Sequence, residues 1–123
     1  MFSRTVNAKI EKKRKYAYIT LTDYGIADDE DDPWSLPMVS TNGDYLVRSY
    51  RILLRDCFLF EDALKNLCLH RLTGFVWQDA ESALSEFLSD TYQTWENLDE
   101  VFFRAGIFYK HLPDKSGNLN DKS

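Results

Sequence analysis

The side chains with the greatest chemical reactivity in the chain are two cysteines and two histidines, Cys57, Cys68, His70 and His111. A zinc site usually needs close ligand pairs such as Cys-x-x-Cys or His-Glu-x-x-His, and neither spacing occurs. A cysteine–histidine pair could act as nucleophile and base, but both cysteines lie in strongly apolar segments, which favours buried, inert thiols. The glycines are scattered and form no phosphate-binding loop. We therefore expect no enzyme, no catalytic residues, no metal site and no cofactor.

A run of acids beside a tryptophan is the most distinctive segment of the chain. Its members are Asp28, Asp29, Glu30, Asp31, Asp32 and Trp34. Carboxylates would steer a basic partner and the indole ring would anchor it, so we predict a partner-binding segment here. A solvated loop that only aids solubility is the alternative. A calcium loop is disfavoured, because Pro33 stands where an EF-hand needs glycine and no glutamate follows at the last ligand position.

Three arginines, Arg48, Arg51 and Arg55, follow at helical spacing. On one helix face they could bind an anionic ligand, because guanidinium groups bind carboxylates and phosphates bidentately. Alternatively they pair with nearby acids, including the acidic run itself. The sequence therefore predicts a possible anion site and, as its competitor, an internal clamp.

Composition indicates one globular domain. The chain has 123 residues, of which 44% are hydrophobic and 15% aromatic, enough for one core without disulfide or metal. The net charge of −5 disfavours direct nucleic-acid binding and favours a basic protein partner. No apolar run is long enough to cross a membrane and the first ten residues lack a signal-peptide pattern, so we expect a cytoplasmic protein.

Hydrophobic patterning predicts the elements that would position these groups. Residues 5–10 and 16–22 alternate or are rich in β-branched and aromatic residues, so we expect an antiparallel hairpin with a basic tip at residues 12–15. Residues 23–43 contain many breakers and are predicted to form a long acidic loop. Apolar residues step by three and four through residues 44–72, which favours helix over strand, with a break near Cys57.

The C-terminal half shows clearer helices. Asp79 is a predicted N-cap for a helix that buries Ala83, Leu84 and Phe87 and turns Glu81, Ser85 and Glu86 outward. A second helix is predicted to begin near Asn97 and to stop at Gly106. This helix contains the adjacent residues Phe102 and Phe103, which cannot both be buried on one narrow helix face. One of them is therefore expected in an exposed patch or a dimer interface.

These elements predict an α+β fold in which a small antiparallel sheet, with its N-terminal hairpin, packs against three or four helices. Residues 1–112 form the predicted domain and residues 113–123 a disordered polar tail. The leading hypothesis is a small acidic inhibitor, immunity or counter-defence protein, a class that the chain resembles in size and charge only. The alternatives are a subunit or adaptor that forms a homodimer or larger oligomer, and a small-molecule-binding domain with an arginine-lined pocket.

Overall fold

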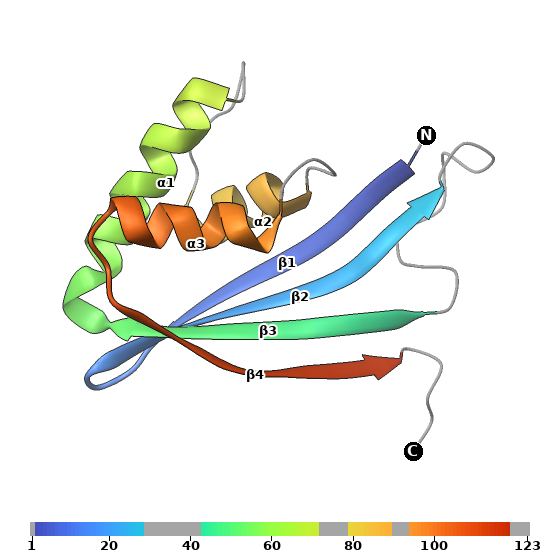
Figure 1. Ribbon diagram of the computed structural model, residues 1–123, viewed down its shortest axis with the longest axis horizontal. Coiled ribbons are helices and arrows are strands. Elements are labelled where there is room, and N and C mark those ends of the chain that lie inside the picture. The colour runs from blue at the N-terminus through green and yellow to red at the C-terminus, as the bar shows by residue number, and fades with distance from the viewer. Residues whose placement is uncertain (1, 29–42, 72–78, 90–93, 119–123) are drawn as a thin grey trace.

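The computed structural model describes residues 2–28, 43–71, 79–89 and 94–118 (Figure 1). The strands are β1 Phe2–Lys12, β2 Tyr16–Asp28, β3 Asp44–Leu53 and β4 Tyr109–Asn118; the α-helices are α1 Cys57–Arg71, α2 Ala80–Ser89 and α3 Trp95–Arg104. The sheet has the order β1-β2-β3-β4, and every neighbouring pair is antiparallel. The predicted α+β fold is confirmed, with three α-helices in the described part of the chain.

The predicted N-terminal hairpin is confirmed. β1 and β2 pair from Phe2 opposite Asp28 to Lys12 opposite Ala17, and the basic turn lies between them. Val6 and Ala8 are buried, as their alternation predicts. β2 continues six residues past Thr22, so the predicted loop is wrong for residues 23–28, while residues 29–42 lie outside the described residues.

The prediction of helix is wrong for residues 44–53, because Asp44–Leu53 forms strand β3. A short 3₁₀ turn, Leu54–Asp56, then leads into α1. Tyr50 and Ile52 are buried on one face of β3, and Arg48 has the same parity. A charged residue on the buried side hides the two-residue period of the strand, and this misled the prediction from sequence.

One face of the sheet carries the core. Ala17, Ile19 and Leu21 of β2 are fully buried, whereas Tyr18 and Thr20 between them are partly exposed. The helices all lie on the buried side of the sheet (Figure 1) and contribute the other half of the core. We call the buried side the covered face and the opposite side the open face.

The boundaries of α2 and α3 follow from local hydrogen bonds. The carboxylate of Asp79 accepts a bond from the Ser82 N–H at 2.7 Å, which confirms the predicted N-cap of α2. α3 begins at Trp95, two residues before the predicted start. It ends at Arg104, and the chain leaves the helix through the predicted stop Gly106, whose φ of 71° suits glycine. The Ile107 N–H donates back to the Phe102 carbonyl at 3.0 Å.

Strand β4 corrects the prediction of a disordered tail for residues 113–118. It pairs with β3 from Tyr109 opposite Ile52 to Asn118 opposite Asp44, with an irregularity opposite Arg48. Most of its side chains are exposed, so the pattern lacks the alternation by which strands are recognised.

None of the helices among the described residues is both long and apolar enough to span a membrane.

Candidate functional site

The predicted acidic docking segment begins where β2 ends. Asp28 is the last residue of that strand and pairs with Phe2 at the start of β1. Asp29, Glu30, Asp31, Asp32 and Trp34 lie outside the described residues. Their binding role stays a prediction.

The structure does not bring the three predicted anion-binding arginines together. Arg48 lies on the covered face of β3, whereas Arg51 lies on the open face, where its guanidinium stacks 4.3 Å from the centre of the Tyr16 ring. Arg55 is exposed in the 3₁₀ turn. The expected helical row does not exist, because a separation of three residues places two side chains on opposite faces of a strand.

Arg48 instead takes part in a polar cluster at the edge of the covered face. Its Nε and Nη2 atoms each lie 3.4 Å from an oxygen of Asp114 on β4. Asp114 also lies 2.8 Å from Nε2 of His111. The His111 ring and then the Arg48 guanidinium lower the pKa of the Asp114 carboxyl, so this carboxylate is ionised at neutral pH. Since Asp114 offsets the charge of Arg48, the cluster gives the arginine a structural role.

Tyr50 lies behind this cluster and is 1% exposed. Its ring stacks on His111 at 5.2 Å and contacts Phe102 at 5.4 Å between centroids. Its buried hydroxyl makes no hydrogen bond of normal geometry within the described part of the chain, although the nearby Arg48 guanidinium interacts with it. Burial, reinforced by the negative charge of Asp99, raises the pKa of Tyr50 to about 12. The phenol therefore keeps its proton at neutral pH and is a poor general base.

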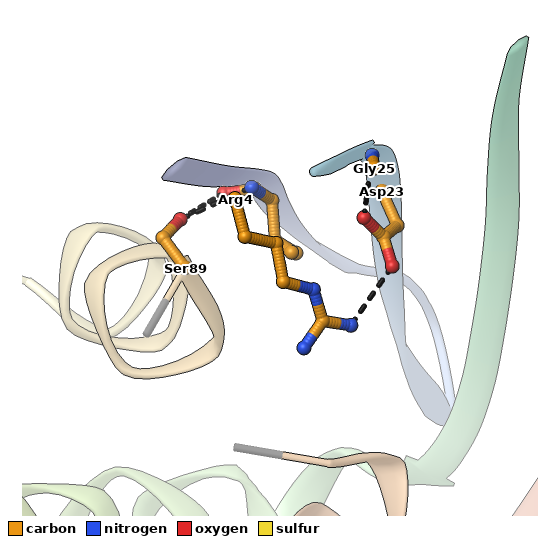
Figure 2. A network of polar contacts seen from close by, with 5 residues as sticks. Arg4, Asp23, Gly25 and Ser89 are labelled. Carbon is orange, nitrogen blue, oxygen red and sulfur yellow. Dashed lines mark hydrogen bonds and ion pairs between the residues drawn. The ribbon is translucent and has the colours of Figure 1, made fainter. Parts of the chain in front are cut away.

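Trp95, at the start of α3, connects this cluster to Arg4 on β1, the edge strand on the opposite side of the covered face. The Arg48 guanidinium lies 4.9 Å from the indole centroid and that of Arg4 lies 5.4 Å from it. Arg4 also forms an ion pair of 2.8 Å with Asp23 on β2, whose carboxylate accepts the Gly25 N–H (Figure 2). One tryptophan thus joins residues of β1 and β3 through their arginines.

A row of polar side chains on α2 binds the outer edge of β1. The N–H groups of Val6, Ala8 and Ile10 donate to Ser89 Oγ, Ser85 Oγ and Glu81 Oε2 at 3.0, 2.9 and 2.8 Å. Figure 2 shows Ser89 beside this edge. The prediction that Glu81 and Ser85 point outward is wrong, because an edge strand offers unpaired N–H donors. The sequence does contain a signal for this contact, because Glu81, Ser85 and Ser89 are each four residues apart and so lie one helical turn apart on one side of α2.

Apolar side chains are exposed around the end of α3. Phe102 is fully buried and its neighbour Phe103 is 83% exposed, which confirms that only one of the two packs inside. Phe103 and Phe108, which is 87% exposed, line an open hollow of about 400 Å³. Phe58 on α1 is also exposed, at 67%. Phe103 and Phe108 share one hollow that Phe58 does not line, and large exposed aromatic residues grouped in this way are typical of binding surfaces.

Within the part of the chain that the structure describes, the remaining reactive groups form no recognisable catalytic set. Cys57 is a free, buried thiol at the start of α1, and burial raises its pKa. The side chains of Cys68 and His70 lie outside the described residues. Among the described residues, no group of three or more histidine, cysteine or acidic side chains is placed to hold a metal ion.

Charge differs between the two layers of the molecule. On α2, α3 and the residue before α2, the exposed carboxylates are Asp79, Glu86, Glu96 and Glu100. The exposed residues of the β1–β2 hairpin and of β4 include many lysines, which are Lys9, Lys12, Lys13, Lys15, Lys110 and Lys115. The described part of the sheet is therefore net positive, and the layer formed by Asp79, α2 and α3 is net negative.

Comparison of the chain with protein-family models, curated proteins and solved structures finds no match.

Proposed function

We propose that this chain is a small acidic protein-binding protein of the inhibitor, immunity or counter-defence type, which docks a basic partner protein. The observation that supports it is a stripe on α3 formed by Glu96, Glu100 and Phe103. These residues are separated by four and three positions, so they share one helix face, and all three are exposed. We call them the α3 stripe.

The α3 stripe combines the two components of a docking surface. The Glu96 carboxylate attracts a basic partner at long range, and Phe103 offers apolar area that a partner pocket would desolvate. Glu100 forms an exposed ion pair of 2.7 Å with Arg104, so a basic partner would have to compete with that arginine for it. The Glu96 carboxyl is held ionised, because its own backbone N–H and then the Thr94 hydroxyl lower its pKa. The acidic segment from Asp28 to Asp32, with Trp34, is proposed as a second part of the same docking function.

Affinity capture from a lysate of the source organism, with the bound proteins identified by mass spectrometry, tests this proposal. We expect a basic protein that is released at about 0.5 M salt, where exposed charges are screened. Phe103→Ser should reduce its recovery, and Phe58→Ser is the matched control, since Phe58 is an exposed phenylalanine on α1. Replacing residues 28–32 with serine and asparagine tests the acidic segment separately. Recovery that is unchanged by both sets of substitutions would contradict the proposal.

A second candidate is a homodimer whose interface includes Phe103 and Phe108. The exposure of both rings around one open hollow favours it. Light scattering at micromolar concentration distinguishes the two candidates. A dimer mass that reverts to a monomer mass in Phe103→Ser supports the homodimer, and a monomer in the wild type removes it.

A further inference from the structure

The open face of the sheet has a composition that differs from the rest of the molecule. Tyrosines occupy alternate positions of the two central strands on this face, namely Tyr16, Tyr18, Tyr24 and Tyr45. All four are partly exposed, and Thr20, Thr22 and Ser49 lie between them. A face of this kind offers aromatic rings and hydroxyl groups on a rigid support.

Basic side chains surround these rings. Lys9 of β1, Arg51 of β3, and Lys110 and Lys115 of β4 have the parity of the open face, as the strand registers show. Glu11 is the one carboxylate of this face among the described residues, and it lies within 4 Å of both Lys9 and Lys13. The open face is therefore net positive, although the chain as a whole is acidic.

One pair of these cations is unfavourable by charge alone, although Arg51 also stacks on Tyr16. Arg51 and Lys110 are directly opposite each other on neighbouring strands. Like charges in this position are destabilising, because their Cβ atoms are roughly 5 Å apart. A bound anion between them would convert the repulsion into attraction, so the pair indicates an anionic ligand.

The hollow beside Arg51 and Lys110 has a size that suits one base or one phosphate of a longer ligand. Tyr16, Arg51, Phe108, Tyr109 and Lys110 line an open hollow of about 230 Å³. Sites for drug-sized ligands usually have roughly 300–1,000 Å³, so this hollow is small for a complete small molecule. A single base or phosphate fits the scale better, with the neighbouring units of the same strand extending over the sheet.

The aromatic rings on this face are arranged for stacking. The Arg51 guanidinium already stacks on Tyr16, and the Lys13 ammonium lies 5.2 Å from the centre of the Tyr18 ring. At the other end, the ring of Tyr45 crosses Gly117 so closely that a Cβ there would lie 2.4 Å from it. A side chain at residue 117 would displace the ring, so glycine keeps Tyr45 flat on the sheet.

We propose that the open face binds single-stranded nucleic acid, with bases stacked on the tyrosines and phosphates held by Arg51, Lys110 and Lys115. Bases in a duplex have no free face for a tyrosine, so a single strand is the form that this surface suits. The net charge of −5 disfavoured nucleic-acid binding, but that value describes the whole chain and does not apply to this positive face of the sheet. This binding uses the face opposite the helices and is independent of the proposed protein docking.

Fluorescence anisotropy with a labelled oligothymidylate of about ten nucleotides tests the proposal. The wild type should bind, and its affinity should fall as salt rises, with a log–log slope of about −0.7 for each phosphate contact. Lys110→Glu with Lys115→Glu should weaken binding by about tenfold or more and reduce the slope. Lys65→Glu with Arg104→Glu makes the same change of charge on the exposed surface of α1 and α3 and should leave the slope unchanged.

A second variant separates stacking from charge. Tyr18→Thr keeps a residue suited to a strand and should weaken binding about fivefold without altering the salt slope, because stacking involves no counterion release. Circular dichroism checks that every variant is folded.

Three results of these binding measurements would overturn the proposal. They are no salt-dependent binding by the wild type, equal losses in the two charge-reversed pairs, and equal affinity for a duplex of the same length. Competition by polyglutamate at the same charge concentration would also overturn it, since that result would indicate an acidic protein ligand.

Discussion

The two faces of the sheet come from the same strands, whose successive residues point to opposite sides, yet the faces have different roles. Ile19 is fully buried against the helices, whereas Tyr18 and Thr20, its neighbours in the chain, face away from them. The covered face holds the fold together through apolar packing. The open face contributes little burial, so its residue types are available for binding. Stability and recognition can therefore be changed separately, by substitutions at adjacent positions.

The largest expected effect contrasts two neighbours on β2. Ile19→Ala should lower the free energy of unfolding by about 2–5 kcal/mol, because it leaves a cavity under the helices. Tyr18→Thr should lower it by less than about 1 kcal/mol, because the ring is partly exposed. Urea unfolding followed by circular dichroism measures both. Similar losses in the two variants would contradict the distinction between the faces.

The next effect concerns the closed edge of the sheet. Ser85→Ala removes the acceptor of the Ala8 N–H and should cost about 1–2 kcal/mol. Ser82→Ala, on the same helix, has the same gain in helix propensity and is the matched control. Hydrogen exchange at the Ala8 amide should become faster in Ser85→Ala alone. An unchanged exchange rate would show that Ser85 does not protect the edge.

A smaller effect of opposite sign is expected at Tyr50 on the covered face. Tyr50→Phe removes a buried hydroxyl that has no hydrogen bond of normal geometry among the described residues, so stability should stay equal or rise by up to about 1 kcal/mol. The midpoint of urea unfolding measures this change. A loss of more than about 1 kcal/mol would indicate that the hydroxyl has a partner in the folded protein.

The smallest expected effect is a pH dependence of stability that comes from Asp114, at the edge of the covered face. The pKa of Asp114 is lowered in the folded protein from its usual 3.8, first by His111 and then by Arg48. The contribution of Asp114 to the free energy of unfolding is therefore complete above pH 3.8. It is lost as the pH falls through the pKa of the folded state. Because Asp114 and its partners are partly exposed, we expect this contribution to stability to be about 0.5 kcal/mol.

Unfolding of the wild type and Asp114→Asn at several pH values checks this. The difference between them should shrink below about pH 4. Asp62→Asn, an exposed acid on α1, is the control. A difference that stays constant down to pH 2 would contradict the assigned cause.

The hairpin, α2 and the end of α3 could be predicted because each has a local signal. Alternation in β1, the Asp79 cap and Gly106 after α3 all act within a few residues. Strand β3 could not be recognised, since the reason for Arg48 on its covered face is Asp114, which lies 66 residues later. β4 is an exposed edge strand with few apolar residues, so it has no periodic pattern.

The candidate surfaces were predicted less well than the fold. An exposed phenylalanine near the end of α3 was expected, and Phe103 fulfils this. The positive open face was hidden, because the residues that form it come from four strands that span residues 2–118 of the chain. Net charge adds all residues together and contains no information about faces.

The row of hydrogen bonds from α2 to β1 also limits how copies of this chain could assemble. A sheet with two free edges can add a partner at each, and repeated addition produces a fibre. Here the β1 edge is occupied by Glu81, Ser85 and Ser89, so in the described sheet only β4 remains for edge pairing. Two copies joined through β4 would each present their closed edge outward. Growth by strand addition would stop at a symmetric pair.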